Sequence, residues 1–195
     1  MFFVKQLIRQ PKIRNMTKFR KVKIDINVNA SKTEVWDLLF NRFGEVNNFN
    51  PLIEGSHHSE GAKGEVGGER VCDLDAKNSI HEKIVAARGN ESFDVDIIKG
   101  GLPMMDKANA TFDLKAINDN QTNVTFTMNF TSKPAFMAPL MKGMMAKMLK
   151  KMLVGLKYHL ETDQLVTKSN ISSIMKGYRK LEDNQSFVAK ELAYA

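Results

Sequence analysis

Apolar and polar residues alternate in a series of short segments that begins near the N-terminus. From Lys18 to Asn29, apolar Val22, Ile24, Ile26 and Val28 alternate with polar residues, which is typical of a β-strand with one buried face. Turns rich in Gly, Asn and Asp separate the later segments. We expect further strands at 52–60, 67–75, 78–88, 91–99, 107–117 and 122–131. Short strands with short connections predict an antiparallel meander.

Two short helices are expected between the first two strands. Ser31, with Glu34 three residues later, forms the capping-box pattern that begins a helix. A second helical piece starts at Arg42 and ends near Asn50-Pro51, because the residue before proline disfavours helical backbone angles.

The 134–163 segment carries the one long helical pattern and half of the chain's methionines. At 100° per residue one broad face carries Met137, Met141, Met144, Met145, Met148, Met152, Leu156 and His159. Lys147, Lys150 and Lys157 fall on the other side. The methionine face is either core or the lining of an adaptable cavity, because methionine is unbranched and polarisable.

Closing the hairpins at their turns predicts a register for the sheet. Position 72 should lie opposite 80, 84 opposite 95, 95 opposite 110, and 112 opposite 128. The last five strands then share one mostly apolar face: Arg70, Cys72, Leu74, Ile80, Glu82, Ile84, Ala86, Phe93, Val95, Ile97, Ala108, Ala110, Phe112, Leu114, Val124, Phe126, Met128 and Phe130. The opposite face is polar, so the long helix must pack on the apolar one.

This order of elements resembles the helix-grip fold of the START/Bet v 1 (SRPBCC) superfamily, close to its polyketide cyclase/dehydrase and lipid transport group. The resembling residues span about 22 to 164. They include Val28-Asn29-Ala30-Ser31 leading to Val35-Trp36, Phe49-Asn50-Pro51, the glycine-rich turn Gly61 to Gly68, and Glu82. The resemblance implies an α+β fold with a seven-stranded antiparallel sheet wrapped around the last helix. It also implies an apolar cavity between the two, but no particular reaction, because carriers, receptors and cyclases share the fold.

Arg70 and Glu82 are the polar residues expected on the inward face. In the predicted register they lie opposite each other and form a partly buried ion pair. The pair either maintains the strand register or recognises the polar end of a ligand, with Arg70 binding a carboxylate, phosphate or enolate. An unpaired charge there would be costly, so the two side chains should touch.

The expected cavity lies between the sheet and the helix. We predict that its ligand-binding residues are Arg70, Glu82, Phe93, Val95, Ile97, Ala110, Phe112, Met128, Phe130, Met141, Met145, Met148 and Met152. The resemblance places a cavity-mouth loop at Gly101, Leu102, Pro103 and Met104. Small Ala110 leaves volume near this loop, unless Phe130, Met104 and Met105 fill it.

No catalytic residue, metal site or cofactor is predicted. His57 and His58 are adjacent in a strand and so point to opposite faces, which prevents both from holding one metal ion. Cys72, the single cysteine, should point inward among apolar neighbours, where its thiol is inert. His159 is expected to be a satisfied core residue.

Net charge separates the N-terminus from the rest of the chain. The protein has 195 residues and a net charge of +7, but residues 1–23 hold eight basic and no acidic residues. The remainder, with 21 basic and 22 acidic residues, is nearly neutral, which argues against a nucleic-acid groove. We therefore expect an arm (1–17), a helix-grip domain (18–165), and a helical extension with a tail (166–195), in which Ile171 to Leu181 forms a short helix.

The arm has three interpretations: an over-extended start ahead of Met16, a weak membrane-surface segment, or a targeting peptide. The first, or a dispensable arm, is favoured. For the whole protein we expect a cytoplasmic carrier of a hydrophobic small molecule, lipid or polyketide-like, that is a monomer or a dimer. The alternatives are a polyketide cyclase/dehydrase-type enzyme with the same cavity, and a protein-interaction module with a closed cavity.

Overall fold

The structure, a computed structural model, describes residues 19–181 and Phe187. The expected arm and most of the expected tail lie outside the described residues. Seven antiparallel strands form one sheet in the order β1-β7-β6-β5-β4-β3-β2. The strands are β1 (Arg20–Val28), β2 (Gly55–His58), β3 (Glu69–Asp73), β4 (Ser79–Arg88), β5 (Ser92–Gly100), β6 (Met105–Asn118) and β7 (Gln121–Ser132).

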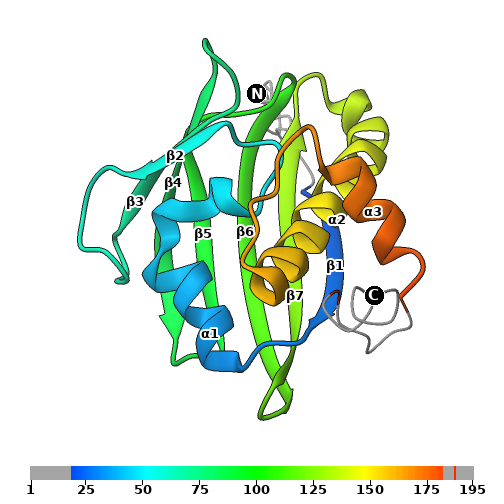
Figure 1. The fold of residues 1–195 in the computed structure, drawn as a ribbon. Coiled ribbons are helices and arrows are strands. Elements are labelled where there is room, and N and C mark those ends of the chain that lie inside the picture. Colours follow the sequence, from blue (N-terminus) through cyan, green and yellow to red (C-terminus); the bar gives the residue numbers. More distant parts are fainter. Residues whose placement is uncertain (1–18, 182–186, 188–195) are drawn as a thin grey trace, which may run out of the picture.

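The helices lie on the same side of this sheet (Figure 1). They are α1 (Lys32–Trp36), η1 (Asp37–Asn41), η2 (Phe43–Asn48), η3 (Ala135–Met137), α2 (Ala138–Thr162) and α3 (Ile171–Tyr178). Ser31 and Glu34 form the predicted capping box at the start of α1. The predicted helix-grip architecture is therefore confirmed. No described helix is both long enough and apolar enough to cross a membrane.

Most of the predicted register is confirmed. Cys72 pairs with Ile80, and Val95 pairs with both Ile84 and Ala110. The pairing of Phe112 was predicted wrongly: it faces Phe126, because the register shifts between Ala116 and Asn118 beside the hairpin turn. An error of two residues keeps every side chain on its predicted face, since side chains alternate with period two.

A bulge in β4 causes a second difference. The register shifts between Ile84 and Ala86, so Ala86 pairs with Asp94 on the outer face. Ala87 takes the inward position opposite Phe93 and packs against the core. An extra residue in one strand reverses the alternation that follows it, so the prediction of an inward Ala86 was wrong.

Two predictions for the faces of the long helix were also wrong. Met144 is 43% exposed, whereas Lys157 is buried at 2%. Lys157 is buried because its Nζ pairs with Glu161 Oε1 at 2.5 Å, and because neighbouring elements cover both sides of this part of α2. Glu161 Oε1 also accepts hydrogen bonds from the backbone and side-chain nitrogens of Asn29, both at 2.8 Å.

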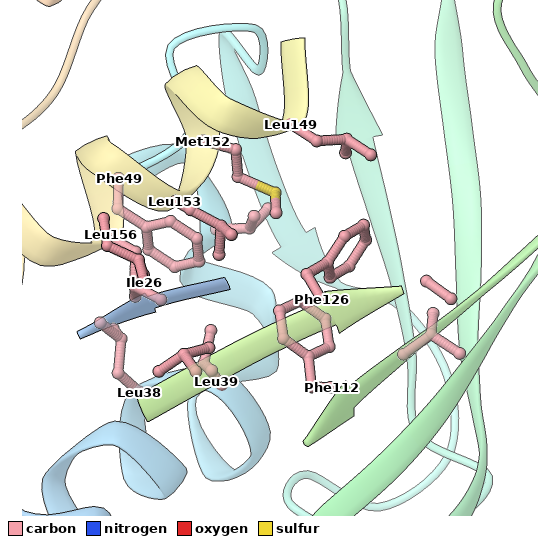
Figure 2. Packing of buried hydrophobic residues seen from close by; sticks show 14 of the residues in the cluster. Ile26, Leu38, Leu39, Phe49, Phe112, Phe126, Leu149, Met152, Leu153 and Leu156 are labelled. Atoms are coloured by element: carbon pink, nitrogen blue, oxygen red, sulfur yellow. The ribbon is translucent and has the colours of Figure 1, made fainter. Parts of the chain in front are cut away.

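The last turns of α2 pack into the hydrophobic core. Figure 2 shows Leu153 and Leu156 of α2 beside Phe49, with Ile26 of β1 below them. The chain after the helix returns to this region, where the Val166 amide donates to Asn48 O at 2.9 Å. The short helix predicted for this region is confirmed as α3, which buries Ile171 and Ile174.

Candidate ligand-binding cavity

A cavity of about 550 Å³ lies between the sheet, α2 and the segment that follows α1. Its wall is mostly apolar, as expected for a cavity formed from the inner face of a sheet and a methionine-rich helix. Exposed Asp75, Asn78, Pro103 and Lys168 belong to the same lining, so they mark where the cavity meets solvent.

Ten of the predicted binding residues line this cavity: Arg70, Glu82, Val95, Ile97, Ala110, Phe112, Met128, Met145, Met148 and Met152. Gly101, Leu102 and Pro103 of the predicted mouth loop also line it. The structure thus brings these side chains to one cavity, and their contact with a ligand stays a prediction.

Four predicted residues lie elsewhere. Phe93 and Phe130 are fully buried, and Met141 is 1% exposed, so all three are core residues. Phe93 stacks on Phe112 at 4.9 Å between ring centroids. Met104 has a φ of 66° and is 43% exposed, while Met105 takes its place in the lining. A side chain on the inner face therefore does not always line the cavity, because neighbouring side chains can lie between it and the cavity.

One wall of the cavity was missed from the sequence. It comes from η1, η2 and the loop after them, and its residues are Leu39, Val46, Phe49, Asn50, Leu52 and Ile53. This segment has irregular backbone and no simple periodicity, so pattern reading does not predict which side faces the sheet. The Phe49-Asn50-Pro51 motif was the one sequence feature in this segment that could have indicated a cavity wall.

The other missed lining residues lie close to predicted ones. They are Cys72, Leu74, Asp75, Asn78, Ile80, Met105, Phe126, Leu149 and Lys168. Lys168 follows α2, so the chain beyond the long helix contributes to the mouth. Its Nζ lies 2.5 Å from Glu54 Oε1, and both side chains are at least half exposed.

Arg70 and Glu82 form the ion pair that was predicted. They pair directly across β3 and β4, and Arg70 Nε donates to Glu82 Oε2 at 2.7 Å. Arg70 Nη1 donates to Phe43 O at 2.7 Å, and the guanidinium lies 3.8 Å from the centre of the Phe43 ring. Burial disfavours the charge on Arg70, but the attraction and hydrogen bonding of Glu82, together with a contribution from Cys72, outweigh it and the pKa of Arg70 is raised.

Cys72 lies beside this pair and is fully buried. Its Sγ lies 3.5 Å from both Glu82 Oε2 and Ser56 Oγ. Burial raises the pKa of the Cys72 thiol to about 12, so the thiolate is scarce at neutral pH. The thiol therefore contributes a weak hydrogen bond to the cavity wall and is a poor nucleophile.

The histidines do not form part of this cavity. His159 Nδ1 lies 2.9 Å from Gln164 O, which satisfies a buried ring as expected. His57 and His58 lie in β2, away from the lining. Within residues 19–181 and Phe187, no group of three His, Cys, Asp or Glu side chains could hold a metal ion.

Residues 20–161 match the model of the family described as polyketide cyclase / dehydrase and lipid transport. The match covers well over half of the chain. The protein belongs to this family. The START/Bet v 1 resemblance is thereby confirmed. No curated protein matches the sequence.

Several solved structures share the fold. A protein from Nitrosospira multiformis is 18% identical with a TM-score of 0.60, covering 74% of this chain and 98% of its own. A START superfamily protein from Mycobacterium smegmatis is 17% identical with a TM-score of 0.58, covering 72% and 98%. Truncated norcoclaurine synthase from Thalictrum flavum is 14% identical with a TM-score of 0.58, covering 75% and 96%. At these identities the likeness establishes the fold alone.

Proposed function

We propose that the protein binds a hydrophobic small molecule, a lipid or polyketide-like compound, in the cavity between the sheet and α2. The observation that carries this proposal is a mostly apolar cavity of about 550 Å³ with one buried ion pair in its wall. Ligand pockets in proteins commonly measure about 300–1,000 Å³ and combine apolar walls with a few polar groups.

Apolar burial supplies most of the binding energy in this proposal, at about 25 cal/mol per Å² before the costs of association. Met145, Met148 and Met152 form the helical side of the wall. Their flexible side chains adapt to ligands of different outline. We therefore expect the cavity to accept a class of related compounds.

The Arg70–Glu82 pair would orient the polar end of the ligand. Glu82 Oε2 accepts hydrogen bonds from Arg70 and Cys72, whereas Oε1 has no hydrogen-bond partner in the described part of the chain. This oxygen can accept from a ligand hydroxyl. A ligand with a hydroxyl or enol at one end of an apolar body fits these groups best.

Native mass spectrometry of protein purified from cells, followed by denaturing extraction, tests the proposal. We expect a stoichiometric apolar compound on the native chain and none on Ala110→Trp, because Ala110 lines the cavity and tryptophan fills it. Ala116→Trp is the matched control, since Ala116 lies exposed on the same strand. An empty protein that also binds no fatty acid, sterol or aromatic polyketide would overturn the proposal.

An enzyme of the cyclase/dehydrase kind is the second candidate. The position of Glu82 favours it, because a carboxylate with one unengaged oxygen beside an apolar cavity can accept a proton. A structural neighbour named as a synthase illustrates that the fold can carry catalysis. Glu82→Gln separates the two functions: an enzyme loses turnover while binding persists, whereas a carrier has no turnover to lose.

A further inference from the structure

Three large apolar side chains protrude from the outer side of η3 and the start of α2. Phe136 is 78% exposed, Leu140 is 69% exposed and Met144 is 43% exposed. Their spacing of four residues places them on one side of the helix. Met141 and Met145, buried at 1% and 2%, occupy the inner side. These outer residues therefore contribute nothing to the core that would explain their size.

Met104 extends this surface from the mouth loop. Its carbonyl oxygen accepts from the Lys133 amide at 2.9 Å, which holds the loop tip beside the start of η3. We call Met104, Phe136, Leu140 and Met144 the apolar tip. In Figure 1 the first turns of α2 project at the margin of the molecule.

The apolar tip adjoins the cavity mouth. Leu102 and Pro103, just before Met104, line the cavity. Met148, one helical turn after Met144, lines it as well. A surface that covers the tip would therefore face the opening.

The surroundings of the tip are basic. Exposed Lys133, Lys147 and Lys151 flank it, and the sequence has no acidic residue from 133 to 160. The neighbouring acid, Asp106, is already paired with Lys133 at 2.6 Å. The tip thus combines protruding apolar side chains with uncompensated positive charge.

We propose that the apolar tip docks on a lipid bilayer with anionic headgroups. Phe136 and Leu140 would enter the interface while the lysine ammonium groups remain at the phosphates. Charge complementarity selects this occupant. A second copy would oppose lysines to lysines, and the arm, with eight basic and no acidic residues in 1–23, would be repelled too.

Docking in this way turns the cavity mouth towards the membrane. A lipid could then pass between bilayer and cavity with little exposure to water. The inference goes beyond ligand binding and does not require it, because the contact is made by the outer surface of the helix. Ala110→Trp, which should fill the cavity and exclude its ligand, should therefore leave docking unchanged.

Vesicle co-sedimentation of the full chain tests the proposal. Phosphatidylcholine vesicles that contain phosphatidylserine should bind the protein, and pure phosphatidylcholine vesicles should bind it weakly. Phe136→Ser/Leu140→Ser and Lys147→Glu/Lys151→Glu should each lower the partition coefficient by at least about tenfold. Ile117→Ser and Lys115→Glu are the matched controls, because both residues are exposed at the far end of β6.

A site-specific probe adds a readout that depends on position. Cys72 is fully buried with a thiol pKa of about 12, so a new cysteine at position 136 can be labelled selectively. A polarity-sensitive fluorophore on Phe136→Cys should shift to the blue with phosphatidylserine vesicles. The same label on Ile117→Cys should not shift.

Three outcomes would overturn the proposal. The first is vesicle binding that both double variants retain. The second is binding lost only in Phe2→Ser/Phe3→Ser, which would assign it to the arm. The third is an absence of vesicle binding, including the case in which a concentration-dependent dimer is lost in Phe136→Ser/Leu140→Ser and the tip proves to be a self-association surface.

Discussion

The two halves of α2 use different residues because they meet different surroundings. Residues 153–162 contain no methionine, and Leu153, Val154 and Leu156 are fully buried. Residues 138–152 contain five methionines, of which three line the cavity and one is exposed at the apolar tip. One helix therefore has a half that packs the core and a half that borders the cavity.

Packing explains the contrast. The sheet lies on one side of the second half, and Phe49 and Val166 lie so close on the other that only glycine fits at position 155. Leu and Val, which have few rotamers, suit such a fully enclosed site. The first half faces a cavity on one side and water on the other, where methionine retains its flexibility at little cost.

The largest effect should come from the buried ion pair that anchors the second half. Glu161→Gln leaves the charge of Lys157 without its partner, so the free energy of unfolding should fall by about 3–5 kcal/mol in a urea titration. The double variant Lys157→Met/Glu161→Gln should recover part of the loss. A loss as small as that in Glu54→Gln, at an exposed pair, would contradict the contrast between the halves.

The next largest difference should appear when one apolar side chain is truncated in each half of α2. Leu153→Ala removes a fully buried side chain and should cost about 2–5 kcal/mol of unfolding free energy. Met148→Ala only enlarges an existing cavity, so it should cost about 1 kcal/mol. Thermal and urea unfolding measure both variants, and equal losses would show that the cavity half is packed as tightly as the other.

The smallest changes in unfolding free energy should come from replacing one glycine in each half of α2 by alanine, and they should have opposite signs. Gly155→Ala would place a Cβ 2.2 Å from Phe49 O, so we expect a destabilisation of about 1–3 kcal/mol. Gly143→Ala meets no atom within 4 Å and should stabilise the helix by about 0.5–1 kcal/mol. Urea titrations of both variants test this contrast, which fails if the two alanines shift stability in the same direction.

The sequence by itself determined the strands, the order of the elements and the meeting of Arg70 with Glu82. Period-two alternation and turn residues are local signals, and two charges on the inner face must find each other to avoid an unpaired buried charge. The long helix followed from its own periodicity in the same way. Even the error in the pairing of Phe112 left the faces of β6 and β7 correct.

Only the tertiary structure decided which inward residues reach the cavity. Phe93, Phe130 and Met141 face inward as predicted but are enclosed by other side chains. The wall from Leu39 to Ile53 has no periodic pattern. Lys157, predicted on the side opposite the apolar face, is buried with its helical neighbour Glu161, which the fold places against Asn29. Periodicity along a chain reports which side of an element is buried, but the void left between elements depends on how their side chains fill space together.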